Sequence, residues 1–260
     1  MNIAFMGTPA FAAVSLNALL EAGHNVTAVY CQPDKVNARG KKIVYGAVKT
    51  LALERGLPLY QPDTLKGTAP PDVDAIIVVA YGKLLPENWL TGTAINVHAS
   101  LLPKWRGSAP IQRAILNGDA ETGVCTMAIE RELDAGGVYL SASRKIGDDE
   151  YFNELHDALA DLGADILIET LKTMPPIIPQ AGNFTYAAPI QKAERALNPD
   201  KSAIENYRRL RAIGPLNCVL DGKALKLHRA HIENGELIPD IVQAPGGKAI
   251  DFAAYLRGRR

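Results

Sequence analysis

The sequence predicts an α/β fold in which a mostly parallel sheet with helices on both faces is followed by a small β-rich unit. Three observations lead to this prediction. Over the first 170 residues, short apolar runs alternate with stretches of helical periodicity, which is the pattern of a parallel sheet covered by helices. Residues 174–186 contain three prolines and no sustained apolar period, which is typical of a linker. Beyond them, short apolar runs are separated by Asp-Gly, Asn-Gly and Gly-Gly turns.

The N-terminal residues show the alternation most clearly. Asn2–Met6 is an apolar run that stops at Gly7-Thr8-Pro9, and the apolar residues between Phe11 and Leu20 then recur at helical spacing. This order predicts a strand, a tight turn and a helix. The sequence contains no GxGxxG and no P-loop lysine pattern, so we do not expect a dinucleotide or nucleoside triphosphate site here. Gly7 is expected to allow close packing of the backbone.

The remaining elements follow from the same reasoning. Further strands are predicted at Val26–Cys31, Ala75–Val79 and Ala94–His98, with an antiparallel hairpin or two edge strands at Val124–Ile129 and Val138–Ser143. Helices are predicted from about Tyr45, at Ser108–Asn117 and at Glu154–Leu171, and beyond the linker at Ser202–Ala212. The short runs of the C-terminal part are Asn217–Leu220, Ala224–Leu227 and Leu237–Val242. Gln32–Lys42 is polar, basic and broken by Pro and Gly, which predicts a loop.

Length and composition limit the class of protein. A chain of 260 residues is long enough for one large and one small domain, and we expect a domain at residues 1–174, a linker at 175–190 and a small domain at 191–260. With 47% hydrophobic and 22% charged residues, the chain is globular, neither disordered nor fibrous. Its apolar runs are shorter than the roughly 18–20 residues that span a bilayer, and the N-terminus lacks the basic region of a secretory signal. We therefore expect a cytoplasmic protein that makes no membrane contact.

The cysteines indicate neither disulfides nor a metal centre. Cys31, Cys125 and Cys218 are odd in number and show no CxxC or Cys/His spacing. We expect buried free thiols and no bound metal.

The charges are unevenly distributed although the net charge is zero. Residues 191–260 contain 13 Lys and Arg against 8 Asp and Glu, and residues 1–190 contain 15 against 20. A basic C-terminal part predicts an anionic partner such as nucleic acid, and a solvated charged tail is the alternative. The predicted loop adds four positive charges within eight residues, which suit phosphate groups or, alternatively, a solvated loop. They are Lys35, Arg39, Lys41 and Lys42.

Three residues form a candidate catalytic set. Asn96 and His98 stand two positions apart at the end of a predicted strand, so their side chains point to the same face. An amide can donate to a developing oxyanion, and an imidazole can donate, accept or shuttle a proton near neutral pH, which suits acyl or formyl transfer. Asp134 precedes Ala135-Gly136-Gly137 on a predicted turn and could orient His98. The alternatives are a hydrogen-bonded structural histidine and an ordinary turn aspartate.

Six segments then occur in a fixed order over the first 170 residues. They are FMGTPAF at Phe5–Phe11, QPDKVNARGKK at Gln32–Lys42, VVAYGKLLP at Val78–Pro86, NVHASLLPKWRGSAPIQRAI at Asn96–Ile115, GDAETGV at Gly118–Val124 and LDAGG at Leu133–Gly137. Together they resemble the methionyl-tRNA formyltransferase family. The Asn-x-His, Ser-Leu-Leu-Pro and Leu-Asp-x-Gly motifs resemble folate-dependent formyltransferases in general, and Lys104–Gln112 resembles the tRNA enzymes in particular.

The resemblance implies a Rossmann-like catalytic domain that uses 10-formyltetrahydrofolate, followed by a small, shortened OB-like barrel that helps to hold tRNA. The methionyl α-amine of initiator tRNA would attack the formyl carbon at Asn96, His98 and Asp134. The folate pocket would be formed, largely through backbone groups and apolar contacts, by Val78, Ala80, Tyr81, Gly82, Leu84, Leu85, Ser100, Leu101, Leu102 and Pro103. The acceptor end of the tRNA would contact the loop that contains Lys35, Arg39, Lys41 and Lys42. Nothing in the sequence indicates an obligate dimer, so we expect a monomer.

The sequence also departs from the family pattern. The family usually has Leu-Asp-Thr-Gly-Asp, and this chain has Ala135 and Gly137 in place of the Thr and the second acid. Segments before Asp72 and Ile95 and the C-terminal part are shorter than usual. Two other functions are therefore considered. One is a formyltransferase for a small amine such as an amino sugar nucleotide, and the other is a folate- or RNA-binding module without catalysis, which retention of Asn96, His98 and Asp134 argues against.

Overall fold

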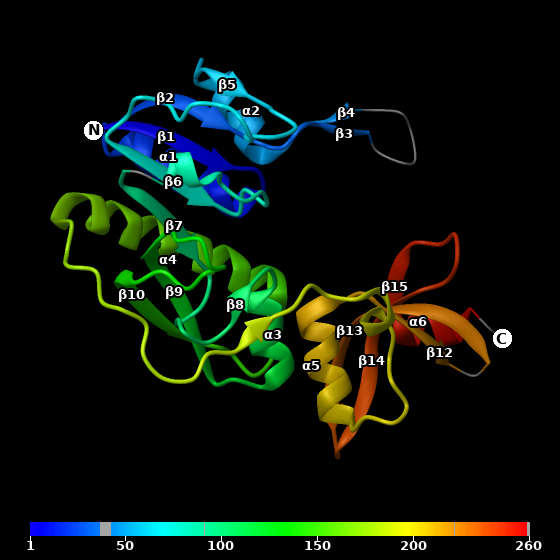
Figure 1. Cartoon of the computed structure of the whole chain (residues 1–260). Coiled ribbons are helices and arrows are strands. Elements are labelled where there is room, and N and C mark those ends of the chain that lie inside the picture. The colour runs from blue at the N-terminus through cyan, green and yellow to red at the C-terminus, as the bar shows by residue number, and fades with distance from the viewer. Residues whose placement is uncertain (37–42, 91, 221, 259–260) are drawn as a thin grey trace. The chain divides into compact units, whose positions relative to one another are not determined.

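The computed structural model describes residues 1–36, 43–90, 92–220 and 222–258 (Figure 1). The chain divides into two compact units, each built from three segments. The first unit comprises Met1–Arg106, Gly123–Ser143 and His156–Thr185, and the second comprises Gly107–Thr122, Arg144–Leu155 and Tyr186–Arg260. The division into residues 1–174, 175–190 and 191–260 stays a prediction.

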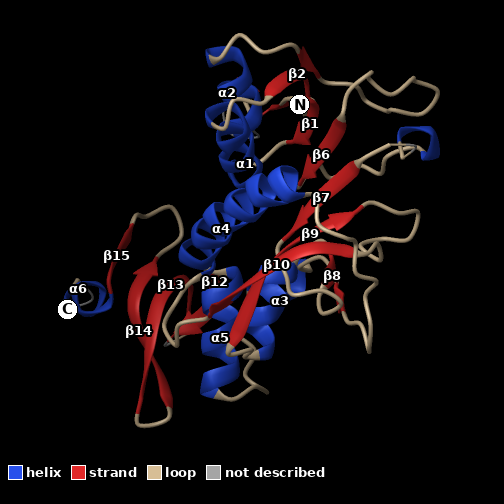
Figure 2. Cartoon of the chain, turned by 90° about the vertical axis from the view of Figure 1, so that its left-hand side faces the viewer, coloured by secondary structure: helices blue, strands red, loops and turns tan. Residues whose placement is uncertain are grey.

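The predicted mostly parallel sheet is confirmed (Figure 2). Seven strands lie in the order β10-β9-β7-β6-β1-β2-β5. The pairs β1–β2, β1–β6, β2–β5 and β6–β7 are parallel, and β9 runs antiparallel to β7. The bounds are β1 Asn2–Gly7, β2 Asn25–Tyr30, β5 Leu59–Tyr60, β6 Ala75–Val79, β7 Ala94–His98, β9 Glu121–Ala128 and β10 Val138–Lys145.

Gly7 ends β1 where the chain turns into α1 (Ala10–Glu21). A Cβ at Gly7 would lie 2.6 Å from Cβ of Ala12 and 2.8 Å from the carbonyl oxygen of Val79. Only glycine permits this approach, so Gly7 serves the close packing expected of it. Helix α1 packs against α2 (Ala47–Glu54) and against β1, β2 and β6.

Helix α4 (Phe152–Thr173) explains why β7 has two different faces. Four of its leucines recur at helical spacing and are buried, namely Leu155, Leu159, Leu167 and Leu171. A Cβ at Gly163 of this helix would lie 3.1 Å from Val97 and 3.3 Å from Val124, so the helix backbone comes close to the sheet at Val97. Because side chains alternate along a strand, Asn96 and His98 point to the opposite face.

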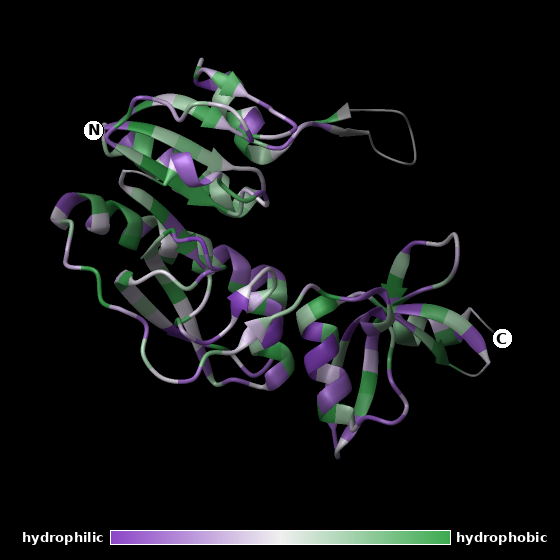
Figure 3. Ribbon diagram, in the orientation of Figure 1, coloured by the Kyte–Doolittle hydropathy of each residue, from purple (hydrophilic) through white to green (hydrophobic). Residues whose placement is uncertain are grey.

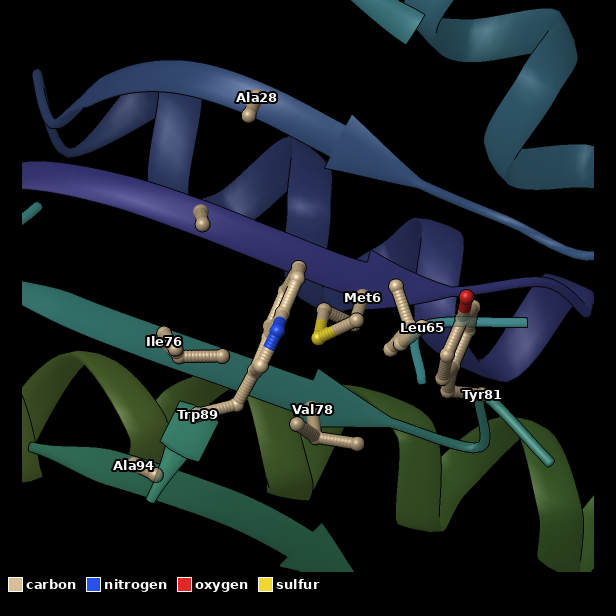
Figure 4. Packing of buried hydrophobic residues seen from close by; sticks show 9 residues of the cluster. Met6, Ala28, Leu65, Ile76, Val78, Tyr81, Trp89 and Ala94 are labelled. Atoms are coloured by element: carbon tan, nitrogen blue, oxygen red, sulfur yellow. The ribbon is translucent and has the colours of Figure 1, made fainter. Parts of the chain in front are cut away.

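A hydrophobic cluster fills that opposite face over the central strands (Figure 4). It is formed by Ala4, Met6, Ala28, Leu65, Ile76, Val78, Tyr81, Trp89 and Ala94. Trp89 closes the short helix η1 (Glu87–Trp89) and is 2% exposed. Figure 3 shows the central strands as predominantly hydrophobic, as expected for strands that are buried on both faces.

The second unit contains the expected small β-rich structure. Strands β12 to β15 form a four-stranded antiparallel sheet in chain order. Helix α5 (Ala203–Ile213) begins with a reciprocal capping box between Ser202 and Glu205 and packs on α3 (Pro110–Asn117), β13 and β14. The strands are β12 Leu216–Leu220, β13 Lys223–Glu233, β14 Glu236–Gln243 and β15 Ala249–Asp251, followed by α6 Phe252–Arg257.

The structure differs from the prediction in several short elements. The predicted loop Gln32–Lys42 contributes β3 (Lys35–Val36), which pairs antiparallel with β4 (Ile43–Val44). Within the predicted linker, Tyr186–Ala187 forms β11, which pairs with β8 (Arg106–Gly107). The short helix η2 (Lys192–Arg195) lies just beyond the linker. Two-residue strands contain too few residues to show an alternating pattern. Among the residues that the structure describes, none of the helices is both long and apolar enough to cross a membrane.

Candidate active site

His98 ends β7 and has partners on both ring nitrogens. Its Nε2 lies 2.9 Å from the carbonyl oxygen of Trp105, and its Nδ1 lies 3.6 Å from Oδ2 of Asp134. A carbonyl oxygen can only accept, so Nε2 carries the hydrogen and donates it. Nδ1 therefore faces the carboxylate, at a distance that is slightly long for a hydrogen bond and suits an ion pair when the ring is protonated. The predicted pairing of His98 with Asp134 is thus present in the fold.

Burial strengthens the electrostatic interaction between His98 and Asp134. The side chains of His98 and Asp134 are 7% and 13% exposed, and electrostatic interactions are stronger when water is largely excluded. Asn96 precedes His98 by two positions on the same strand face and is half-buried. The three predicted catalytic residues therefore come from β7 and from the β9–β10 connection, which reaches His98 through Asp134.

The backbone is strained at three non-glycine residues around this site. Ala80, Trp105 and Asp134 have φ values of 47°, 64° and 50°, in the left-handed region that side chains with a Cβ disfavour. Such conformations persist only where surrounding contacts hold them, and they gather at functional sites. Trp105 and Asp134 are the two residues that contact the ring nitrogens of His98.

Two residues that the sequence analysis did not single out support this arrangement. Gln180 donates from Nε2 to the carbonyl oxygens of Asp134 and Gly136, each at 2.8 Å. Arg106 donates from Nε and Nη2 to Oε1 of Gln180 at 3.0 and 2.8 Å. Arg106 is 7% exposed, which is rare for a charged side chain. No sequence signal joins two residues that stand 74 positions apart.

Apart from Val78, which lies within β6, the residues predicted to bind folate follow β6 and β7. Strand β6 ends at Val79 and β7 at His98, and the two strands are neighbouring and parallel. The segments that leave them therefore begin at the same edge of the sheet, where α/β proteins bind ligands. Ala80 and Gly82 have left-handed backbones. Ser100–Pro103 begins two residues after His98 and has a cis bond between Leu102 and Pro103.

The side chains of this set differ in what they can offer a ligand. Val78 and Tyr81 belong to the hydrophobic cluster (Figure 4). Tyr81 is 1% exposed, and burial raises the pKa of its phenol to about 12. Ser100 is buried and donates to the carbonyl oxygen of Lys104 at 2.6 Å, whereas Leu84 is 81% exposed. The side chains of Val78 and Tyr81 are therefore packed inside the protein, and the part of these residues in a folate pocket stays a prediction.

The predicted tRNA-binding residues lie mostly outside the described residues. This holds for Arg39, Lys41 and Lys42, and for Lys35 the structure describes the backbone in β3. The residues around this segment form a polar network. Lys49 donates to Asp34 at 2.5 Å and to Gln61 at 2.9 Å, and the hydrogen bond from Lys49 lowers the pKa of the Asp34 carboxyl.

The cysteines are buried and free, as expected. Burial raises the pKa of the Cys125 thiol to about 11, which disfavours the reactive thiolate. Within the described parts of the chain, no group of three or more His, Cys, Asp or Glu residues is arranged to hold a metal ion.

Comparisons with known proteins identify the family of the chain. A family model for formyl transferases matches residues 1–171. A methionyl-tRNA formyltransferase of Methylococcus capsulatus is 45% identical over 249 residues, which cover 89% of this chain and 81% of that protein. The one of Stutzerimonas stutzeri is 37% identical over 299 residues, which cover 100% of this chain and 95% of that protein. That alignment is longer than this chain of 260 residues, so part of the relative has no counterpart here.

Solved structures show the same fold. A methionyl-tRNA formyltransferase from Clostridium thermocellum has a TM-score of 0.65 at 18% identity, covering 96% of this chain and 99% of that one. An N-formyltransferase from Helicobacter canadensis, in complex with folinic acid and dTDP-3-aminofucose, has a TM-score of 0.69 at 16% identity, covering 96% and 98%. The family match and the relatives of 37–47% identity settle the assignment. The chain belongs to the formyl transferase family and, within it, to the methionyl-tRNA formyltransferases.

Proposed function

We propose that this chain transfers the formyl group of 10-formyltetrahydrofolate to the α-amine of the methionyl residue on initiator tRNA. The observation that carries the proposal is the buried His98–Asp134 pair, 3.6 Å apart, beside Asn96 at the end of β7. These groups can stabilise an oxyanion and move a proton, which are the two requirements of formyl transfer to an amine. The family of the chain supports the same reaction.

The three residues have separate roles in this proposal. As the α-amine nitrogen forms its bond to the formyl carbon, Asn96 donates to the formyl oxygen, on which negative charge develops. The His98–Asp134 pair takes up the proton that leaves the amine. As the bond between the formyl carbon and N10 of the folate breaks, the pair returns this proton to N10, and tetrahydrofolate leaves. Asp134 keeps the imidazole oriented and stabilises its protonated form. Trp105 fixes the ring from the other side by accepting from Nε2 at 2.9 Å.

The residues at the edge of β6 and β7 fit a folate. Backbone groups at Ala80 and Gly82, next to the left-handed turns, can contact a pterin closely because they present no bulky side chain. The remaining pocket residues, Leu84, Leu85 and Ser100–Pro103, lie on the same two connections. When bound, 10-formyltetrahydrofolate supplies the activated formyl group.

The tRNA contacts are proposed for the basic loop and the C-terminal residues. The support is the excess of 13 cationic over 8 anionic residues in 191–260 and the four cations Lys35, Arg39, Lys41 and Lys42. Phosphate contacts of this kind position an RNA without reading its sequence. A cytoplasmic location and a monomeric state complete the proposal, and light scattering at working concentration tests the latter.

The test is formyl transfer from 10-formyltetrahydrofolate to initiator Met-tRNA, elongator Met-tRNA, free methionine and a dTDP-linked amino sugar. We expect transfer to the initiator tRNA above all others. Transfer to the amino sugar in place of tRNA would contradict the proposal and indicate a small-amine formyltransferase, and folate binding without transfer to any acceptor would indicate a non-catalytic module.

The loop is tested separately by Arg39→Ala. We expect the KM for tRNA to rise at low salt with kcat unchanged, because a phosphate contact contributes to binding. Lys172→Ala is the matched control, since Lys172 is an exposed cation near the end of α4 whose side chain is 75% exposed. Equal KM values in the two variants would show that Arg39 makes no contact with tRNA.

A further inference from the structure

Gln180 occupies an unusual place in the connecting segment after α4. Both hydrogens of its amide nitrogen go to the loop that contains Asp134, and its oxygen receives two hydrogens from Arg106. Four hydrogen bonds, all between 2.8 and 3.0 Å, use both donors of the amide and both lone pairs of its oxygen. A side chain that only tethered the segment would need fewer hydrogen bonds.

The contacts of Gln180 complete a closed circuit of bonds and contacts that includes the catalytic pair. His98 Nε2 donates to Trp105, and Trp105 is bonded covalently to Arg106. Arg106 donates to Gln180, Gln180 donates to the backbone of Asp134, and the Asp134 carboxylate returns to His98 Nδ1. This closed circuit of contacts therefore fixes the imidazole and the carboxylate relative to each other.

The backbone of Asp134 explains why such a support is needed. With φ at 50°, the residue is in a region that costs of order 1–3 kcal/mol for a non-glycine residue. The two carbonyl groups that Gln180 holds, at Asp134 and Gly136, lie on either side of the turn. Without them the turn is free to relax, and the carboxylate then leaves its position at Nδ1.

Arg106 is itself fixed by several contacts. Its guanidinium stacks over the ring of Phe184 at 4.7 Å and lies 3.5 Å from Glu132. Its backbone N–H donates to the carbonyl oxygen of Thr185 at 2.9 Å. The planar guanidinium of an arginine can donate two hydrogen bonds that converge on one amide oxygen from fixed directions, which a lysine cannot. The orientation of Gln180 is thus determined from its oxygen side.

We propose that Gln180 is a positioning residue, oriented by Arg106, that sets the Asp134 carboxylate against His98 for formyl transfer. The proposal rests on the catalytic roles of His98 and Asp134 in the proposed function. In this proposal the segment after α4 contributes to the chemical step through Gln180, and it also joins the elements on either side.

The decisive variant is Gln180→Glu. A glutamate keeps the oxygen that accepts from Arg106 and lacks the hydrogens for Asp134 and Gly136, so it breaks one half of the link only. We expect kcat to fall roughly 10- to 100-fold with the KM values for folate and tRNA within about twofold of wild type, since small misplacements of a catalytic group reach this size. Gln191→Glu is the matched control, because this exposed side chain lies at the N-cap of η2 and donates to Pro189 at 3.3 Å, so its contacts are within its own turn and not in the loop that contains Asp134.

A double-mutant cycle separates positioning from general damage. If Gln180 acts through Asp134, adding Gln180→Glu to Asp134→Asn costs less than about twofold further, because the group to be positioned is already altered. If the fold losses in kcat of the two single variants multiply in the double variant, or if Gln180→Glu alone retains wild-type kcat, the proposal is overturned. Should Gln180→Glu fold poorly in a thermal melt, Arg106→Lys provides the same test from the oxygen side.

A spectroscopic measurement makes the result independent of activity. The ¹⁵N signals of the His98 imidazole report its hydrogen bonds, and we expect Gln180→Glu to shift them while Gln191→Glu does not. Wild-type His98 signals in Gln180→Glu would overturn the proposal even if no formyl transfer were found. Absence of transfer by the wild-type protein, in contrast, would count against the proposed function alone.

Discussion

Replacing Gly137 by alanine is expected to destabilise the protein by about 1–3 kcal/mol. A Cβ at this position would overlap the Cγ2 methyl of Ile177 and lie 3.1 Å from the carbonyl oxygen of Ile178. Ile178 exchanges two backbone hydrogen bonds with Val138, at 2.8 and 2.9 Å. Making room for the methyl group loosens this pairing, and two hydrogen bonds at roughly 0.5–1.5 kcal/mol each give the expected range.

Urea unfolding followed by circular dichroism measures the loss. Gly92→Ala is the matched control, because a Cβ at Gly92 meets no described atom within 4 Å and adds only the stabilisation of about 0.4–1 kcal/mol from a stiffer unfolded chain. In a second variant, Ile177→Ala combined with Gly137→Ala removes the overlapping methyl and is expected to lower the cost of the alanine at 137. Equal stability of Gly137→Ala and Gly92→Ala would refute this reasoning.

The same contact explains the departure of this chain from the family pattern at residue 137. The Cβ of an aspartate there would overlap the Cγ2 methyl of Ile177 in the same way as the Cβ of an alanine. The pairing of the connecting segment with Val138 would then be loosened, and Gln180 stands only two residues further along. Gly137 is therefore coupled to the path of the connecting segment in this protein.

Three further predictions concern stability and reactivity. The thiols of the native protein are expected to react slowly with a thiol reagent, since all three cysteines are buried, and three thiols per chain are expected to react in denaturant. Rapid modification of the native protein would contradict their burial. Tyr81→Phe is expected to be neutral or stabilising by up to about 1 kcal/mol, because the buried hydroxyl has no partner among the described residues and an unsatisfied group is costly; a loss above this size in urea unfolding would reveal a missing partner. The hydrogen bond from Arg113 lowers the pKa of the Glu194 carboxyl, so this pair stabilises the fold above the unfolded pKa near 4.5 and ceases to do so as the pH falls through the lower folded value. Arg113→Met should thus reduce the urea midpoint at pH 7 more than at pH 3, and an equal reduction would show that the ion pair contributes nothing.

The main elements could be predicted because their sequence signals are local. Ala75–Val79 and Ala94–His98 coincide with β6 and β7, since each is a short apolar run bounded by turn residues. Alternation along β7 also sufficed to place Asn96 and His98 on one face. The motif around Asp134 supplied the third residue, and the structure brings it to His98 as expected.

Other features depend on contacts that no local pattern encodes. The support of Asp134 comes from Gln180, which stands 46 positions away in a segment that shows only the composition of a linker. Helix α6 has six residues and follows a three-residue strand, too short for a helical period to emerge. In both cases the structure results from tertiary hydrogen bonds and caps rather than from the distribution of apolar residues.

The most direct test of the catalytic assignment is single-turnover formyl transfer to initiator Met-tRNA by His98→Ala and Asp134→Asn, beside the wild-type protein. Saturating 10-formyltetrahydrofolate and tRNA isolate the chemical step from binding. We expect the rate constant to fall by roughly 10²- to 10⁴-fold in each variant, as is usual when acid–base assistance is lost. Rates within about threefold of wild type in both variants would contradict the assignment of the His98–Asp134 pair as the catalytic centre.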